Sequence, residues 1–209
     1  DRKDRDIKTR LLEINKIAAT YYYHQLKSEA GKSGLDYLVK RGLSDKTINS
    51  FGLGFAPQST GELYRMLKDK GYDDEILKES GLFTYEKGVR DKFWNRVIFP
   101  IMDINNKVIG FGGRVMGDAK PKYLNSPETK LFDKSRNLYG LNAARTARKN
   151  NLIICEGYMD VISLHQAGFT QAVASLGTAL TPGHARLMKR YTDNVPITYD
   201  RDEAGVKAA

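Results

Sequence analysis

The sequence has little cysteine and histidine, and it has no long apolar run. A single cysteine, Cys155, stands among 209 residues, which excludes an internal disulfide framework and a zinc site built on cysteine pairs. The three histidines, His24, His165 and His184, are widely scattered and are predicted to be structural. No apolar stretch approaches the roughly 20 residues that cross a bilayer, and the charged start lacks the apolar core of a secretory signal. We therefore expect a soluble, cytoplasmic chain without a membrane partner.

The charge of the chain is concentrated in one segment. The net charge is +9, and residues 86–149 hold 14 lysines and arginines against 6 acids, whereas residues 1–85 hold 15 against 13 and residues 150–209 hold 5 against 6. A local basic block attracts polyanions such as nucleic acid or nucleotides. A solvated surface that favours solubility explains the same block equally well, so charge alone leaves both interpretations open.

The first half of the chain predicts helices followed by a hairpin. Residues 1–40 carry apolar side chains at helical spacing, and further short helices are expected over 45–50, from 60 or 61 to 70 and over 73–80, with the run 51–57 as a break. Residues 96–102 and 108–114 predict two strands around a turn. Gly110, Gly112 and Gly113 indicate either close approach of a strand or phosphate, or a bulge.

The last part of the chain alternates between predicted strands and helices. Short apolar runs at 152–155, 172–175 and 195–199 are separated by helical segments over 160–167 and 181–191, the second with Thr181 as N-cap and Pro182 at its first position. This alternation predicts a parallel sheet. We assign the chain to the α/β class, with an α+β subdomain over 1–149 and a parallel-sheet α/β subdomain over 150–209.

Four acids are expected near one edge of that parallel sheet. Glu156 follows the first predicted strand, and Asp200 and Asp202 follow the third; ligands bind beyond the carboxyl ends of such strands. Asp160 lies one helical turn after Glu156. Carboxylates suit Mg²⁺ or Mn²⁺. Helix capping is the alternative, which we favour for Asp160 alone, but three carboxylates at one edge repel each other and indicate a cation.

Two spaced motifs give a specific resemblance. Residues 156–160 (EGYMD) together with 200–205 (DRDEAG) resemble the Toprim domain shared by primases, topoisomerases and some nucleases. The segments 96–101, 108–114, 121–129 and 138–140 resemble the bacterial DnaG-type primases. The similarity covers nearly the whole chain and is weak only in roughly the first 85 residues, where helical character outweighs motif.

The resemblance implies DNA-directed synthesis of short RNA primers from ribonucleoside triphosphates on a single-stranded DNA template, by a metal-dependent nucleotidyltransferase. Mg²⁺ or Mn²⁺ would be bound by Glu156, Asp200 and Asp202, with Asp160 as a weaker candidate. Glu156 is then the general base or metal-orienting acid, and Asp200 and Asp202 are direct ligands. The segment 150–209 is expected to be the Toprim subdomain.

A second set of residues is expected to bind nucleotide or nucleic acid, because a metal site for polyphosphate needs further cations to balance charge. The basic and polar members of this set are Lys122, Lys134, Arg114, Asn125, Tyr123, Arg96 and Arg90, of which the two lysines are the first candidates for triphosphate contacts. Trp94 stands where the family usually has arginine, and we predict that it packs.

Parts of the family pattern are not recognised in these residues: a third acidic cluster, an N-terminal zinc-binding domain and a C-terminal domain that binds the replicative helicase. We therefore expect a Toprim subdomain that is incomplete at its C-terminal side, in a monomeric fragment whose catalytic competence alone is in doubt. Two alternatives stay open. The chain is another Toprim enzyme, a topoisomerase or nuclease, or it is a non-catalytic module that binds nucleic acid or nucleotide.

Overall fold

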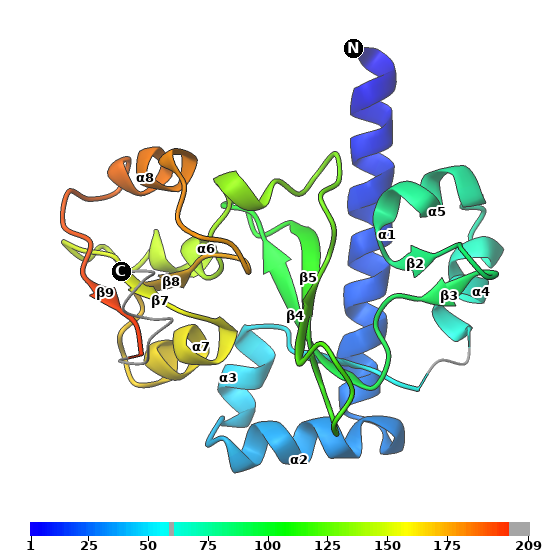
Figure 1. Cartoon of the computed structure of the whole chain (residues 1–209), viewed down its shortest axis with the longest axis horizontal. Coiled ribbons are helices and arrows are strands. Elements are labelled where there is room, and N and C mark those ends of the chain that lie inside the picture. Colours follow the sequence, from blue (N-terminus) through cyan, green and yellow to red (C-terminus); the bar gives the residue numbers. More distant parts are fainter. Residues whose placement is uncertain (59–60, 201–209) are drawn as a thin grey trace. The chain divides into compact units, whose positions relative to one another are not determined.

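A computed structural model describes residues 1–58 and 61–200 of the chain (Figure 1). Its contacts divide the chain into a first unit, Asp1–Ile101 with Lys107–Phe132, and a second unit, Met102–Asn106 with Asp133–Ala209. The predicted subdomain boundary after residue 149 stays a prediction, and by contacts residues 133–149 belong to the second unit. Among the described helices, none has the length and apolarity needed to cross a membrane.

The first unit combines helices with a four-stranded sheet of order β1-β4-β5-β6 and a separate antiparallel pair, β2 and β3. Its helices are α1 (Arg2–Leu26), the 3₁₀ turn η1 (Glu29–Gly31), α2 (Lys32–Lys40), α3 (Asp45–Ser50), α4 (Glu62–Asp69) and α5 (Asp74–Ser80). Its strands are β1 (Gly54–Ala56), β2 (Phe83–Thr84), β3 (Arg90–Asp91), β4 (Arg96–Met102), β5 (Val108–Val115) and β6 (Tyr123–Asn125).

Helix α1 organises the core of the first unit. Leu11, Ile14, Ala18 and Tyr22 recur at intervals of three and four residues and are all buried, so they form one stripe along the helix. The Tyr22 ring meets the edge of Phe111 on β5 with ring centroids 5.5 Å apart. The long blue helix accordingly runs beside β4 and β5 in Figure 1. The helices predicted over residues 1–40, 45–50, 61–70 and 73–80 are confirmed within a few residues at their ends.

The run 51–57, which we predicted to be a break between helices, contains strand β1. The break is confirmed, since α3 ends at Ser50 and α4 begins at Glu62. The strand within it was not predicted: all three residues of β1 are buried, so no alternation of polar and apolar residues signals it. Gly54 pairs with Ile98 of β4. A Cβ at Gly54 would lie 2.7 Å from the main-chain carbonyl carbon of Tyr22, and only glycine permits this approach of β1 to α1.

Two glycines of the predicted hairpin make room for aromatic rings. A Cβ at Gly110 would lie 3.0 Å from the ring of Phe132, and one at Gly113 would lie 2.9 Å from the ring of Phe93. Both rings are buried. From the sequence, these glycines could allow close approach of a strand or a phosphate, or form a bulge. At Gly110 and Gly113 the closely approaching groups are aromatic side chains of the core.

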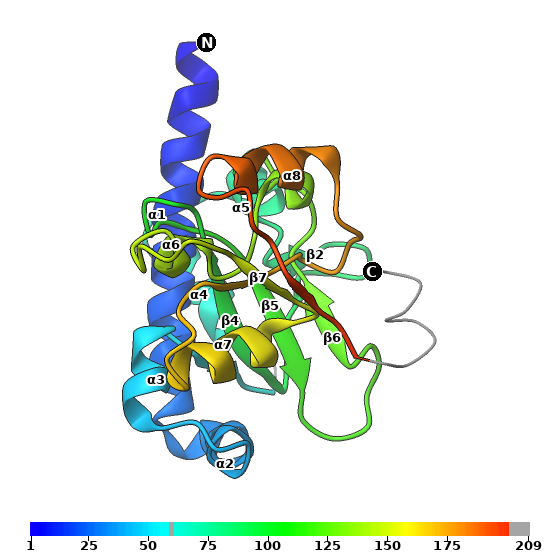
Figure 2. The same ribbon diagram turned by 90° about the vertical axis from the view of Figure 1, so that its left-hand side faces the viewer.

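The second unit contains the predicted parallel sheet. Its elements are η2 (Lys134–Arg136), α6 (Leu141–Ala144), β7 (Ile153–Cys155), α7 (Tyr158–Gln166), β8 (Ala172–Ala174), α8 (Pro182–Lys189) and β9 (Ile197–Thr198). The strand order is β8-β7-β9, with both pairs parallel. The chain crosses from β7 through α7 to β8, and then back past β7 through α8 to β9. Because right-handed crossovers in opposite directions lie on opposite faces of a sheet, α7 and α8 cover opposite faces, as both views show (Figures 1 and 2). The α/β class is confirmed.

Replacing Gly54 by alanine should destabilise the first unit by about 2 kcal/mol, because the added methyl group overlaps main-chain atoms of α1 that cannot rotate away. Denaturant unfolding measures the change. Gly157→Ala is the control, since its backbone is extended and a Cβ there meets no atom within 4 Å. Equal stability of both variants would contradict the role given to Gly54.

Candidate functional site

The parallel sheet brings two of the predicted acids together. The pairing of Cys155 with Thr198 aligns the carboxyl ends of β7 and β9. Glu156 follows β7 directly and Asp200 follows β9 by two residues. The backbone N–H of Asp200 donates a hydrogen bond to Glu156 Oε1 at 3.0 Å. Asp160 is in the first turn of α7, and all three carboxylates are exposed.

The structure describes only some of the predicted metal ligands. Asp202 lies outside the described residues, and within 1–58 and 61–200 no group of three or more His, Cys, Asp or Glu side chains is placed to hold an ion. The donor chemistry nevertheless fits a hard cation. Exposed carboxylates at one sheet edge suit Mg²⁺, which keeps several waters and takes one or two protein carboxylates.

Strand β7, which ends directly before Glu156, is held by burial and by a hydrogen bond from β9. Cys155 is buried, and burial raises the pKa of its thiol, so the thiol stays protonated near neutral pH and is a poor nucleophile or metal ligand. The hydroxyl of Thr198 donates to the backbone oxygen of Ile154 at 3.0 Å. This hydrogen bond joins β9 to β7, the strand that leads into Glu156.

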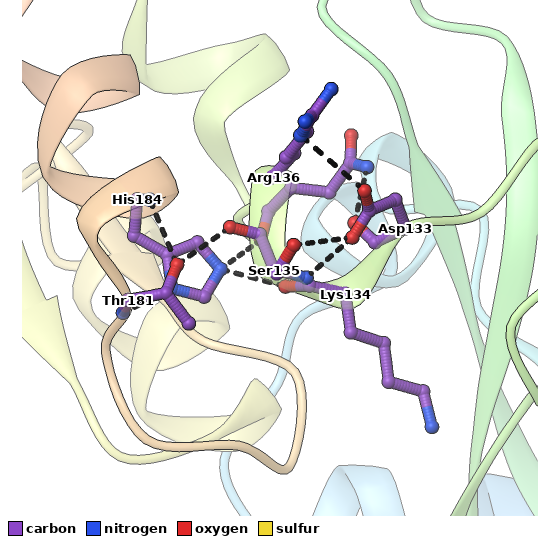
Figure 3. Close-up of polar contacts among 7 residues, drawn as sticks. Asp133, Lys134, Ser135, Arg136, Thr181 and His184 are labelled. Atoms are coloured by element: carbon purple, nitrogen blue, oxygen red, sulfur yellow. Dashed lines mark hydrogen bonds and ion pairs between the residues drawn. The ribbon is translucent and has the colours of Figure 1, made fainter.

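Lys134 lies in a turn that is shaped by Asp133 (Figure 3). The Asp133 carboxylate accepts hydrogen bonds from the backbone N–H of Ser135 at 2.9 Å and from its hydroxyl at 2.6 Å. The hydrogen bonds from Ser135 lower the pKa of Asp133, with a smaller contribution from the charge of Arg136. Asp133 is therefore ionised at neutral pH and caps the short η2 turn.

The start of α8 holds the same turn from the other side (Figure 3). The Thr181 hydroxyl donates to the Ser135 carbonyl at 2.7 Å. His184 Nε2 lies 2.7 Å from the Lys134 carbonyl and 3.1 Å from that of Asn137. His184 Nδ1 accepts from the backbone N–H of Thr181 at 3.1 Å. Because the two carbonyls can only accept, Nε2 carries a proton, and because Nδ1 accepts the Thr181 N–H, it carries none; the ring in this arrangement is therefore neutral.

Thr181 is confirmed as the N-cap of α8, in a capping box with His184 at its third position. His184 is fully buried, which confirms its predicted structural role. Its link to residues 134–137 was not predicted. No local signal could have shown it, because the partners are about 50 residues apart in the sequence.

In the first unit, Arg96 is buried, although the sequence placed it among candidate phosphate contacts. Its guanidinium donates to the carbonyls of Gly113 at 3.2 Å, Lys122 at 3.3 Å and Pro121 at 2.9 Å. Burial lowers the pKa of Arg96 from its usual value, which leaves it charged at neutral pH. In this position Arg96 holds the backbone that presents Lys122.

Arg114 and Tyr123 are paired directly across β5 and β6. The Arg114 guanidinium lies 4.5 Å from the ring centroid of Tyr37 on α2, a cation–π distance. Burial raises the pKa of Tyr123 to about 12, with a smaller effect of Tyr37, so its phenol keeps its proton at neutral pH. The Tyr123 side chain is still 40% exposed and can meet a ligand.

The other predicted residues of the first unit are near or at the surface. Lys122 and Arg90 are exposed, and Asn125 is half-buried on β6 opposite Gly112.

Trp94, which we predicted to pack, is 44% exposed. That prediction was wrong for much of the indole, because the adjacent Asn95 has a positive φ of 50° and the chain turns sharply there.

Comparison with known families shows to which family the chain belongs. Residues 21–145 match the DNA primase catalytic core, N-terminal domain, and residues 153–209 match the Toprim-like family. The chain belongs to the DNA primase catalytic core family.

This primase chain is similar to several relatives. It is 50% identical to a DNA primase of Clostridium acetobutylicum over 208 residues, which are 99% of this chain and 35% of the relative, and 46% identical to that of Escherichia coli K12 over 91% of this chain and 33% of the relative. The chain thus spans about a third of the length of the curated relatives it matches.

Solved structures agree with this primase fold. The RNA polymerase domain of the Mycobacterium tuberculosis primase DnaG superposes with a TM-score of 0.90 at 35% identity, over 96% of this chain and 69% of that one. A DnaG primase catalytic domain bound to single-stranded DNA superposes with a TM-score of 0.89 at 43% identity, over 100% of this chain and 65% of that one. The recognised family is confirmed.

Replacing Arg96 by methionine should destabilise the primase core by about 2 to 4 kcal/mol, because three carbonyls lose a charged donor in the interior. Denaturant unfolding measures the loss. Arg90→Met is the matched control, since it removes the same group from an exposed position. A loss no larger than that of the control would argue against the buried role.

Replacing Thr181 by valine should cost about 1 to 2 kcal/mol, because the N-cap of α8 and the bond to Ser135 are both lost. Amide hydrogen exchange should also accelerate at residues 134–137. Thr170→Val is the control, since its hydroxyl makes no hydrogen bond among the described residues. Unchanged exchange at 134–137 would show that α8 does not hold this turn.

Proposed function

We propose that this primase core serves DNA-directed synthesis of short RNA primers from ribonucleoside triphosphates, by metal-dependent nucleotidyl transfer. The observation that carries the proposal is the meeting of Glu156 and Asp200 at the carboxyl edge of β7 and β9, within the Toprim-like part of the chain. Family membership supports the same reaction.

Glu156, Asp200 and Asp202 would hold Mg²⁺ or Mn²⁺, with Asp160 as a weaker candidate. The bound cation would supply charge neutralisation to the reacting phosphates. Glu156 has a second task that needs no metal: its Oε1 accepts the Asp200 N–H and so orients the segment after β9. The other Glu156 oxygen remains available for a cation or for a proton from the attacking hydroxyl.

The basic residues would bind nucleotide and template. Lys134 and Lys122 are the proposed triphosphate contacts, because each has a cationic side chain on a main chain whose carbonyl is bound by a buried side chain, His184 for Lys134 and Arg96 for Lys122. Arg114, Arg90, Tyr123 and Asn125 would contact single-stranded DNA through charge, stacking and hydrogen bonds. Arg96 would act through the carbonyls that it holds.

The partners follow from the same assignment. Single-stranded DNA is the template, and a relative solved with single-stranded DNA supports it. The replicative helicase is a partner that the family resemblance assigns to a region not recognised in this chain. We expect a monomer that works in the cytoplasm, where replication takes place.

Two other functions are weaker. A topoisomerase or nuclease would share the Toprim acids, but the match of residues 21–145 to the primase core favours a primase. A non-catalytic binding module would use the basic residues and need the acids only as helix caps. The contact between Glu156 and Asp200 disfavours it, since the Glu156 carboxylate accepts the backbone N–H of Asp200 beyond β9.

Glu156→Gln or Asp200→Asn, made in the complete protein, should lower magnesium-dependent ribonucleotide incorporation on a single-stranded template by about 100-fold or more. Both variants should keep wild-type unfolding, because both acids are exposed. Asp160→Asn is the matched control and should lose less.

Manganese binding by calorimetry gives a second measurement of the same variants. We expect weaker binding for Asp200→Asn than for Asp160→Asn. Full incorporation by the first two variants would refute the catalytic assignment, and metal-independent activity would refute the metal.

A further inference from the structure

One face of α8 and the neighbouring η2 turn enclose a basic pocket. The pocket has a volume of about 400 Å³ and is lined by Arg136, Gly183, Arg186, Leu187 and Arg190. Positions 183, 186, 187 and 190 recur at intervals of three and four, so they share one face of the helix. All the residues belong to the second unit. We call this site the arginine pocket.

The arginine pocket is a built feature, because its two walls are fixed to each other. A Cβ at Gly183 would lie 2.7 Å from the Ser135 carbonyl oxygen and 3.5 Å from Cγ of Arg136, so glycine allows α8 to approach η2 this closely. Thr181 and His184 tie the same turn to α8 (Figure 3). The backbone of Arg136 is therefore held against the helix that carries Arg186 and Arg190.

The charges of the pocket are poorly compensated. Arg136 Nε lies 3.5 Å from Asp133 in an exposed ion pair, and such a pair contributes little. Within the described part of the chain, no carboxylate is in ion-pair range of Arg186 or Arg190. Three guanidinium groups around one cavity repel each other, and an anion in the cavity would relieve this repulsion.

We propose that the arginine pocket binds the phosphodiester backbone of a nucleic-acid strand. Guanidinium groups match phosphate oxygens with two parallel hydrogen bonds. None of the five lining residues is aromatic, so the pocket offers no aromatic ring on which a base would stack and suits a backbone better than a free nucleotide. Arg186 and Arg190 are four residues apart, about 6 Å along the helix, and can contact successive phosphates.

The proposal deepens the proposed function, on which its choice of partner rests. It adds a strand contact on α8 that is separate from the predicted basic residues Lys122, Arg114 and Arg90 of the first unit. Arg136 is two residues after Lys134, so a strand in the arginine pocket would pass close to the lysine proposed to bind triphosphate.

Binding of a labelled single-stranded oligonucleotide tests the arginine pocket, by fluorescence anisotropy on the full chain without metal or nucleotide. Arg186→Gln/Arg190→Gln should weaken binding at least about tenfold near 0.1 M salt. The slope of log affinity against log salt should fall by about 1.4, since each lost contact removes about 0.7. Arg136→Gln should lower the slope by about 0.7.

The matched control is Lys149→Gln/Lys189→Gln, which removes two charges from the same unit at positions that do not line the pocket. An equal loss in this control would show a general effect of charge and overturn the proposal. Wild-type binding by the arginine variants would also overturn it.

Two further probes separate other ligands. Calorimetry with ATP should show the same affinity for the arginine variants and the wild type; a loss confined to ATP would make the pocket a nucleotide site instead. Competition by poly-glutamate that is lost with the arginines, while oligonucleotide binding persists, would indicate an acidic protein partner. Because these measurements involve no catalysis, they can fail while the Glu156→Gln result still stands, and the reverse also holds.

Discussion

The parallel pairing of β7 with β9 is the constraint on which the functional part of the structure depends. It joins segments more than 40 residues apart and places Glu156 beside the backbone of Asp200. A shift of one residue in this pairing would turn the side chains of the short strand β9 to the opposite face. Burial of Cys155 and the hydrogen bond from Thr198 stabilise the observed register. The exposed acids therefore follow directly on strands that are held in place.

The two units use the same means to hold a basic residue in place. In the first unit the buried guanidinium of Arg96 binds the carbonyls of residues 121 and 122. In the second, the buried imidazole of His184 binds the carbonyls of residues 134 and 137. In each case a buried side-chain donor binds carbonyls of a connecting segment. The nearby lysines thereby gain a defined backbone.

Glycines act in both units where main chain approaches other atoms closely. Gly54 brings β1 against α1, and Gly183 brings α8 against the turn of residues 134–136. A methyl group at either position would overlap main-chain atoms. The basic block seen in the sequence is not a uniform charged surface: Arg96 is a buried structural donor, and Arg136 lines a pocket together with two arginines from outside the block.

The sequence by itself determined the family, the helices of the first unit, the hairpin of β4 and β5, the alternating strands and helices of the second unit, and the N-cap of α8. Motifs, apolar periodicity and capping are local properties. The sequence also placed Glu156 and Asp200 after parallel strands. Tertiary structure alone decided that β1 is a strand, that Arg96 is buried, that Trp94 is partly exposed and that His184 holds the turn of Lys134. These features depend on contacts between residues distant in the sequence, and burial or hydrogen bonding across such distances leaves no local pattern to read.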